Sequence, residues 1–376
     1  MGAQDQAAVI AFLADPASHD GHAVQRIDTH ASIVFLAGDH AFKLKRAVRF
    51  SYLDYSTPAL REQACRAELA LNRRTAPELY EEVCPIARAA DGHLSLGGVG
   101  AVVDWVVVMR RFDQDTLFDR MAERNQLSVP LVFDLAGQIA RFHAAAEIDD
   151  ESGGHQGMAA TTASDARNLR AAVPVTLDAS AVEPLIAGIQ AELARVAPLL
   201  EQRRRAGKVR HCHGDLHLRN ICLVAGRPTL FDCVEFSRLI SNIDVLYDLA
   251  FLLMDLHARG LDALGNAAFN HYLDLQDESD GLAAMPLMLS VRAAVRAHVT
   301  AAAAGRQTQP DSQSRTRDEA SRYLAHAADL LKPRPPCLIA IGGLSGTGKS
   351  TVAYGLAPDI GGVPGARSVC ASDRPE

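Results

Sequence analysis

Short apolar runs bounded by turn residues recur in the first third of the chain, and this pattern predicts β-strands. Residues 32–36 and 41–44 are two apolar runs joined by Gly-Asp at 38–39, which is the spacing of a β-hairpin. Residues 102–109 contain five valines among eight residues and predict a buried strand. Helical spacing of apolar residues predicts helices at 5–14 and 58–72.

From about residue 130 the apolar residues follow the period of a helix instead. Helices are predicted at 130–146, at 180–202, after Asp244 and at 283–304. Residues 149–164 and 305–318 are polar and predict loops. A β-rich start followed by helices predicts an α+β fold with two lobes around a cleft. We expect one lobe at about 1–110 and the other at about 111–332.

Composition limits the class of protein further. The chain has 376 residues, 48% of them hydrophobic, which is enough for two domains with a sizeable core. A net charge of −7 predicts no nucleic-acid partner, because such a partner needs a basic surface. Seven cysteines without CxxC pairs indicate reduced thiols. We find neither a signal peptide nor an apolar run of about 18 residues. The sequence therefore predicts a cytoplasmic location and no membrane partner, and it leaves the oligomeric state open.

The strongest chemical signal is the stretch His-Gly-Asp-Leu-His-Leu-Arg-Asn at 213–220. Two short apolar strands are predicted after it, at 221–224 and 228–231, and Asp232 follows the second one. Kinases use an aspartate to orient the acceptor hydroxyl and take its proton, and an asparagine and a second aspartate to hold magnesium against ATP. The pattern predicts Asp215 as the catalytic base and Asn220 and Asp232 as magnesium ligands.

Such a site also needs a cation on the ATP phosphates. Lys43 and Lys45 lie two residues apart on the second strand of the hairpin, so both side chains face the same side. A glutamate on a helix would fix the phosphate-binding lysine, and Glu68 is the candidate. We favour Lys43, but strand alternation does not separate it from Lys45. A solvated charge on an edge strand is the alternative role for either lysine.

Two further elements have open roles. Asp248 opens a predicted helix, where its carboxylate could accept N–H groups of the catalytic loop; simple capping of that helix by Asp244 is the alternative. The strand at 102–109 runs into Arg-Arg-Phe at 110–112, which has the position of a hinge that meets adenine. An ordinary core strand fits that segment equally well.

Together these residues resemble the aminoglycoside phosphotransferase family, which has a protein-kinase-like fold. The matching motifs are HGDLHLRN, LFDCVEF and YDLAF, within a resemblance that covers about residues 20–300. The stretches FKLKRAVRFSYLDYST, ELALNRRTAPELY and VMRRF are similar to a bacterial group in which such a domain precedes a P-loop kinase domain of AAA or zeta-toxin type. The resemblance implies that Asp215 is the base, that Asn220 and Asp232 bind magnesium, and that Lys43 with Glu68 positions phosphate. It does not identify the acceptor.

A second nucleotide motif, GLSGTGKST at 343–351, satisfies the P-loop pattern GxxxxGK[ST]. It follows an apolar run predicted as a strand at 337–341 and opens a helix predicted to end near Pro358. One more strand-like run, at 368–371, is followed by Asp373. We therefore expect residues 333–376 to be a truncated P-loop segment after a kinase-like domain at 1–332. The expected phosphate-binding residues of this loop are Gly343, Gly346, Gly348, Lys349, Ser350 and Thr351.

The sequence thus predicts an ATP- and magnesium-dependent phosphotransferase that acts on a small hydroxylated molecule. One rival is a non-catalytic ATP-binding module that regulates an attached P-loop kinase. The tight turn at 38–39 favours this rival a little, because a glycine-rich phosphate loop is not obvious. In a second rival the P-loop is the enzyme and the kinase-like part binds substrate.

Overall fold

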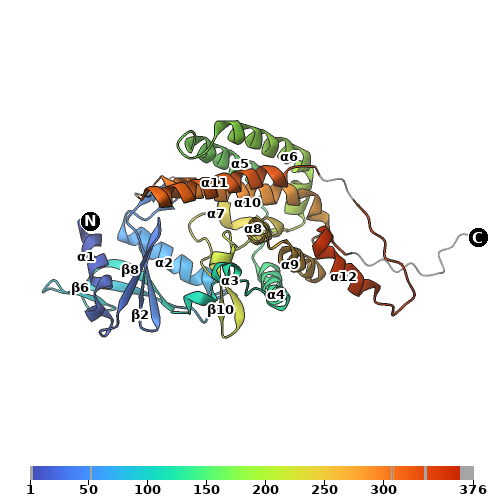
Figure 1. The fold of residues 1–376 in the computed structure, drawn as a ribbon. Helices are drawn as coiled ribbons and strands as arrows, with labels where there is room; N and C mark the ends of the chain where they lie inside the picture. The colour runs from blue at the N-terminus through green and yellow to red at the C-terminus, as the bar shows by residue number, and fades with distance from the viewer. Residues whose placement is uncertain (1–2, 51–52, 306, 308, 334–336, 365–376) are drawn as a thin grey trace, which may run out of the picture. The chain divides into compact units, whose positions relative to one another are not determined.

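The computed structural model describes residues 3–50, 53–305, 307, 309–333 and 337–364 (Figure 1). The chain divides into two compact units, and each is described by itself. The first contains Met1–Gln126, Phe142–Gly157 and Arg203–Asp248, and the second contains Leu127–Arg141, Met158–Gln202 and Leu249–Glu376. The predicted lobe boundary near residue 110 and the predicted domains at 1–332 and 333–376 stay predictions.

A six-stranded antiparallel sheet forms the centre of the first unit, with the order β1-β2-β3-β8-β6-β7. Its strands are β1 (Val24–Asp28), β2 (Ser32–Ala37), β3 (His40–Lys45), β6 (Tyr80–Arg88), β7 (Leu94–Leu96) and β8 (Ala101–Arg110). The predicted hairpin is confirmed, since β2 pairs with β3 around the turn at 38–39. In β3, Lys43 pairs with Val34 on one side and with Val107 on the other, so this strand is internal and not an edge.

The two faces of this sheet pack against different helices, α1 (Ala3–Ala14) and α2 (Pro58–Asn72) (Figure 1). Leu44 and Val106 belong to the core cluster that contains α1. Val107 belongs to the cluster around Cys65 of α2. Because neighbouring residues of a strand point to opposite faces, Lys43 and Lys45 lie on the α2 face. Both helices were predicted from the sequence, and Thr57 caps the start of α2.

The remaining elements of the first unit are short and carry the catalytic-loop motif. The strand β10 (Ile221–Val224) pairs with β11 (Arg227–Leu230), and β9 (Val209–His211) pairs with β12 (Asn242–Asp244). The helix α8 (Val245–Ala258) begins here, directly after β12. The other short elements are η1 (Pro16–His19), β4 (Arg49–Phe50), β5 (Leu53–Asp54), η2 (Gln114–Thr116), α3 (Phe118–Glu123), η3 (Leu218–Asn220) and α7 (Arg238–Ser241).

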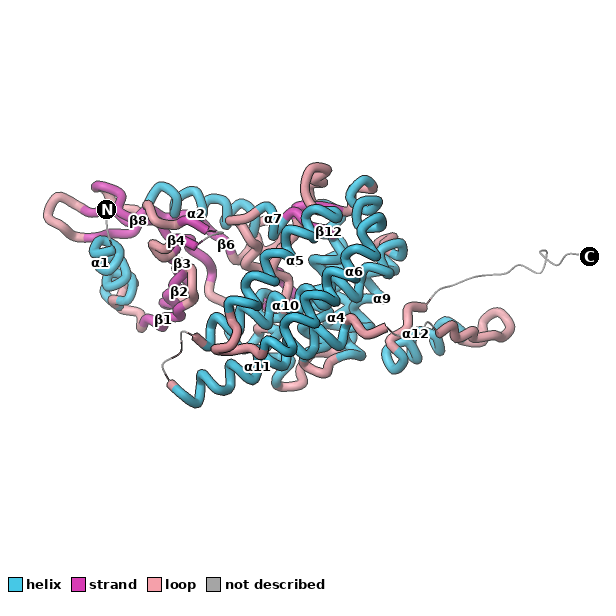
Figure 2. Tube along the Cα trace, turned by 90° about the horizontal axis from the view of Figure 1, so that it is seen from above, coloured by secondary structure: helices cyan, strands magenta, loops and turns pink. Residues whose placement is uncertain are grey.

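The second unit is helical in its described residues. Its helices, some of which continue into the first unit, are α4 (Val129–Ala145), α5 (Gly154–Ala171), α6 (Ala179–Arg205), α9 (Asp262–Leu275), η4 (Ser279–Ala284), α10 (Met285–Ala304), α11 (Pro310–Leu330) and α12 (Lys349–Ile360). The helices α10 and α11 lie side by side (Figure 2), and the Ser290 hydroxyl donates to the Ala327 carbonyl. Among the described residues, the stretch Ser279–Ala304 is long and apolar enough to cross a membrane by length and composition, and 56% of its most apolar window is buried.

Three predictions about loops and strands are wrong. The polar stretches 149–164 and 305–318, which were expected to be loops, contain the starts of α5 and α11. In α5 the buried residues Met158, Thr162 and Leu169 follow helical spacing, and their packing outweighs the polar composition of the rest of the segment. Residues 337–341 do not form a strand, because among the described residues no strand pairs with them, and Leu338 is 95% exposed. The run at 368–371 and Asp373 lie outside the described residues.

Candidate active site

Asp215 lies in the loop between β9 and the short helix η3, within the first unit. Asn220 is the last residue of that helix, and its side chain contacts Asp215. Its Nδ2 donates to the Asp215 carbonyl and to Asp215 Oδ2, at 2.9 Å each. The side chain of Asp215 is 40% exposed. Gly214 has a φ of +84°, and a Cβ there would lie 3.0 Å from the Ile240 carbonyl oxygen, so the loop requires glycine at this position. The five-residue spacing in the motif therefore places one hydrogen-bonded aspartate at an accessible position.

The base of this loop is held by a buried carboxylate, Asp248, in the first turn of α8. Its Oδ2 accepts the His213 N–H at 3.1 Å, and its Oδ1 accepts the Gly214 N–H at 2.9 Å. The role expected for Asp248, as an acceptor of loop N–H groups, is confirmed. Asp244 also fills its alternative role: its Oδ1 accepts the Leu246 N–H at 2.9 Å. The two roles do not exclude each other, because the two carboxylates face different donors.

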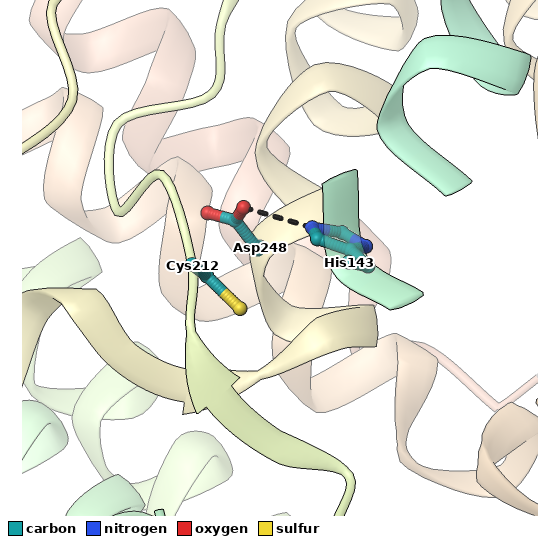
Figure 3. A group of neighbouring side chains, drawn as sticks. All are labelled: His143, Cys212 and Asp248. Atoms are coloured by element: carbon teal, nitrogen blue, oxygen red, sulfur yellow. Dashed lines mark hydrogen bonds and ion pairs between the residues drawn. The ribbon is translucent and has the colours of Figure 1, made fainter. Parts of the chain in front are cut away.

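His143, Cys212 and Asp248 form a buried cluster whose ligand atoms lie within 4.8 Å of one another (Figure 3). We tested whether this cluster fits a metal ion. His143 Nε2 lies 3.0 Å from Asp248 Oδ2, which also accepts a loop N–H, and the Cys212 thiol donates to the Ile243 carbonyl. A metal would have to replace hydrogen bonds that hold the catalytic loop, so the donor set fits structural support better than a metal site.

His213 adds a second support from within the loop. Its Nδ1 accepts the Asp215 N–H at 3.3 Å, and its Nε2 lies 2.9 Å from the Phe231 carbonyl oxygen. Because Nε2 faces a carbonyl oxygen, it carries a proton and donates it to Phe231. The histidine thus ties the loop to the residue that precedes Asp232.

The hairpin of β10 and β11 brings Asp232 to the same place. Ile221 pairs with Leu230, and the Phe231 N–H donates to the Asn220 carbonyl at 3.0 Å, so Asp232 follows the residue that faces Asn220. Asp232 has a φ of +64°, which is unfavourable for a residue with a side chain. Its N–H donates to the Tyr80 hydroxyl, and its side chain is 40% exposed. Asn220 and Asp232 supply oxygen donors of the kind that magnesium prefers.

The two lysines of β3 form ion pairs with carboxylates of α2 and of the segment that begins at Asp232. Lys43 Nζ lies 2.6 Å from Glu68 Oε1 and 2.5 Å from Asp232 Oδ1. Lys45 Nζ lies 2.5 Å from Glu68 Oε2 and 2.5 Å from Glu235 Oε1. The sequence did not separate the two lysines. In the structure both lysines contact Glu68, but their second carboxylate partners differ: Lys43 contacts Asp232 and Lys45 contacts Glu235.

Charge compensation keeps these buried groups ionised. Burial alone lowers the pKa of Lys43, but the charges of Asp232 and Glu68 outweigh it and hold that pKa well above its ordinary value. Burial raises the pKa of Glu68, but the ammonium groups of Lys43 and Lys45 outweigh burial and lower that pKa to about 2. Glu68 is therefore an anion throughout the neutral range and can fix a cation on β3.

Sequence analysis missed His143, Glu235, Tyr80, and Tyr55, whose hydroxyl donates to Glu235 Oε1 at 2.5 Å. For Glu235 a signal was present, since it follows Asp232 by three residues and Lys45 shares its strand face with Lys43. Two buried ammonium groups on one face need more than one carboxylate. For His143 the sequence offers no comparable signal.

The P-loop motif lies in the second unit. Gly348 has a φ of +78° and precedes α12, while Ser350 and Thr351 lie in the exposed first turn of that helix. Lys349 Nζ donates to the Leu344 carbonyl of the same loop at 2.6 Å. The helix packs against α9, where the Tyr354 hydroxyl donates to Asp274. It ends at Ile360, two residues after Pro358, near which the sequence predicted its end. Gly343 and Gly346 also have positive φ values, of 158° and 78°.

An aspartate–asparagine loop, a second aspartate after a hairpin and a lysine–glutamate pair on a sheet and a helix define a phosphotransferase of protein-kinase-like fold. The chain belongs to the phosphotransferase enzyme family (APH), which it matches over residues 33–287.

Curated relatives include the uncharacterized protein Rv2004c of Mycobacterium tuberculosis and the uncharacterized protein Mb2027c of Mycobacterium bovis. Each is 29% identical over 340 residues, which are 89% of this chain and 65% of the relative. The chain thus spans about two thirds of the length of these relatives.

Similar solved structures include a choline/ethanolamine kinase family protein from Mesorhizobium loti, with a TM-score of 0.48 and 17% identity over 86% of this chain and 99% of that one. Another is an ethanolamine kinase of Plasmodium vivax, with a TM-score of 0.49 and 11% identity over 84% of this chain and 83% of that one.

Proposed function

We propose that this protein transfers a phosphoryl group from ATP to a hydroxyl group of a small molecule and that it requires magnesium. The observation that carries the proposal is the meeting of Lys43, Glu68 and Asp232 in the unit that also contains the Asp215–Asn220 loop. Membership of the phosphotransferase family supports the same reaction class.

In the proposed reaction, Asp215 accepts the proton of the acceptor hydroxyl while that oxygen attacks the γ-phosphate. An exposed aspartate is a weak base, but in a loose transition state the proton leaves late, so orientation matters more than basicity. The Asn220 amide holds Asp215 Oδ2 and thereby fixes the orientation of the carboxylate. The Lys43 ammonium would exchange its contact with Asp232 for one with the α- and β-phosphates. Its ion pair with Glu68 would stay in place.

Magnesium would be held by Asn220 and Asp232 and would neutralise charge on the phosphates. The fit rests on the donor chemistry of this structure. The Asn220 amide uses its Nδ2 on Asp215, which leaves Oδ1 as the hard oxygen donor, and the Asp232 carboxylate is partly exposed.

The test is a thermal-shift measurement of the purified chain with ATP, in magnesium and in EDTA. ATP should raise the Tm much more with magnesium, because a ligand that binds only the native state stabilises it by RT ln(1 + [L]/Kd). Asp232→Asn should remove most of the difference. An unchanged magnesium-dependent shift in the variant would exclude Asp232 from the metal site.

The non-catalytic rival remains a second candidate, because β2 and β3 are joined by the two residues Gly38 and Asp39 and not by a glycine-rich loop. In that rival the unit binds ATP and regulates a P-loop kinase. Transfer of labelled phosphate from ATP to a panel of amino alcohols, sugars and aminoglycosides separates the two, since the rival predicts binding without transfer.

For the remaining properties we propose a cytoplasmic protein whose partner is a small-molecule acceptor, with no nucleic-acid or membrane partner. The net charge of −7 supports the absence of a nucleic-acid partner, because such a partner needs a basic surface. We also propose that the loop at 343–351 belongs to a P-loop kinase domain of the kind found after such phosphotransferase domains. The support is the GxxxxGK[ST] pattern followed by a helix that begins at Lys349.

A further inference from the structure

Lys45 is a second buried ammonium group in the first unit, and the proposed phosphoryl transfer does not use it. Its side chain is 3% exposed, less than the 11% of Lys43. Removing an ammonium group from water is costly, so its partners have to compensate. These partners are Glu68 Oε2 and Glu235 Oε1, each at 2.5 Å, and the ring of Tyr55, whose centroid lies 5.3 Å from Nζ.

Glu235 is held as firmly as Lys45. Its carboxylate is 4% exposed, and its Oε1 accepts both the Lys45 ammonium and the Tyr55 hydroxyl at 2.5 Å. We call Lys45, Tyr55 and Glu235 the clamp. Because Glu235 follows Asp232 by three residues, the clamp fixes the chain just beyond the expected metal ligand.

Asp232 needs such support because its backbone is strained. A φ of +64° is unfavourable for a residue with a side chain, and it persists only where the surroundings impose it. Three hydrogen bonds contribute: Asp232 N–H to the Tyr80 hydroxyl, Cys233 N–H to Asn72 Oδ1, and Val234 N–H to the His213 carbonyl. The clamp adds a charged anchor next to this series.

Glu68 links the clamp to the phosphate-positioning lysine. One carboxylate oxygen meets Lys43 and the other meets Lys45. If Lys43 turns from Asp232 to a phosphate, Lys45 still holds Glu68, and Glu68 still holds Lys43. The three carboxylates Asp232, Glu68 and Glu235 exceed the two ammonium groups by one negative charge, and Asp232 is the partly exposed member of the set.

We infer that the clamp positions Asp232 for the metal-bound nucleotide, so that Lys45, Tyr55 and Glu235 set the metal affinity without touching the metal. This inference rests on the proposed function. The clamp members are positioning residues, which act through Asp232 and Glu68.

The experiment titrates magnesium into the protein at saturating ATP and follows the Tm. The readout is the metal concentration that gives half of the shift. Lys45→Met and Glu235→Gln should each raise this concentration about tenfold, since groups that orient metal ligands typically change metal affinity by 10–100-fold. ATP affinity in EDTA should stay within about twofold, because the clamp does not touch the nucleotide. The variant that combines Lys45→Met with Glu235→Gln should need about the same magnesium concentration as the weaker-binding single variant, because the two residues act through one contact.

The sign for Lys45 distinguishes positioning from simple electrostatics. Loss of a nearby positive charge would by itself strengthen cation binding and lower the half-saturating concentration. The clamp predicts a rise instead, and Lys45→Arg should restore part of the affinity. The matched control is Arg26→Met, which removes the exposed ion pair of Arg26 with Asp28 on β1 and should leave the titration unchanged.

Failure of the clamp and failure of the proposed function are distinguishable. If the wild-type chain gains no magnesium-dependent shift with ATP, the proposed function fails. If the wild type gains this shift and Asp232→Asn loses it, while Lys45→Met and Glu235→Gln keep the wild-type half-saturation, only the clamp is overturned. If Lys45→Met does not fold, the decision rests on Glu235→Gln and on Tyr55→Phe. Tyr55→Phe removes one hydroxyl and should raise the concentration about threefold. If Glu235→Gln and Tyr55→Phe both keep the half-saturating magnesium concentration of the wild type, the inference is overturned.

Discussion

Lys43 and Lys349 are both expected to bind nucleotide phosphates, but their surroundings differ completely. Lys43 lies on a strand that is paired on both sides, and its ammonium lies between Glu68 and Asp232. Lys349 is the half-buried first residue of α12, and its ammonium donates to a carbonyl of the preceding loop. One lysine is fixed by residues far away in the sequence, and the other by its immediate neighbours.

The comparison shows that a sequence motif supplies phosphate-binding groups but does not by itself hold them in position. In the first unit, burial lowers the local dielectric and strengthens each interaction between charges. The sheet and α2 keep the lysines and carboxylates at fixed distances from one another. In the described part of the P-loop segment no strand supports the loop, so phosphate there would compete with water. We therefore expect catalysis to belong to the first of the two sites.

The largest expected effect concerns Asp215. Asp215→Asn keeps the shape and hydrogen bonding of the side chain but removes the base. Transfer to an acceptor should fall by roughly 10²–10⁴, the scale of a lost acid–base group, while ATP affinity stays within a few-fold. Single-turnover kinetics measure the transfer rate, and an ATP-binding titration measures the affinity. Wild-type transfer in a folded variant would move the chemistry away from this loop and make the P-loop segment the stronger candidate.

The next effect concerns the stability of the buried charges. Glu68→Gln leaves Lys43 and Lys45 with one carboxylate partner fewer each, so unfolding should require about 3 kcal/mol less free energy at neutral pH. Because the folded-state pKa of Glu68 is depressed to about 2, the difference between wild type and variant is complete above the unfolded value of 4.5 and is lost as the pH falls toward 2.

Urea unfolding at several pH values measures this difference. The control is Glu62→Gln in the same helix, where Glu62 forms a surface pair with Arg66 and the expected change is below about 0.5 kcal/mol. A difference that stays constant down to pH 2 would contradict the depressed pKa of Glu68.

The smallest effect is expected at Lys349, where the comparison is most direct. Lys349→Ala should leave the magnesium-dependent ATP shift and any phosphate transfer nearly unchanged, because the loop binds phosphate weakly. The same substitution at Lys43 should remove most of both. The comparison would be reversed if Lys349→Ala abolished ATP hydrolysis while Lys43→Ala preserved it.

Much of the fold could be predicted because it depends on local pattern. Apolar runs around a turn predicted β2 and β3, valine-rich composition predicted β8, and helical spacing predicted α1 and α2 within a few residues. The wrong predictions have a common cause, which is dependence on distant partners. The polar start of α11 is helical in a segment whose later residues pack against α10, whereas residues 337–341 have strand-like composition without a paired strand in the described chain.

The sequence by itself determined the residues that lie close together along the chain. The spacing of Asp215, Asn220 and Asp232 follows from one loop and one hairpin, and strand alternation placed Lys43 and Lys45 on one face. Only the tertiary structure decided which carboxylate each lysine meets. The Lys45–Glu235 pair joins residues 190 positions apart. The two oxygens of Glu68 on α2 contact two different lysines of β3, which no local spacing encodes. Such pairings arise because buried charges must find partners wherever the packed chain brings them.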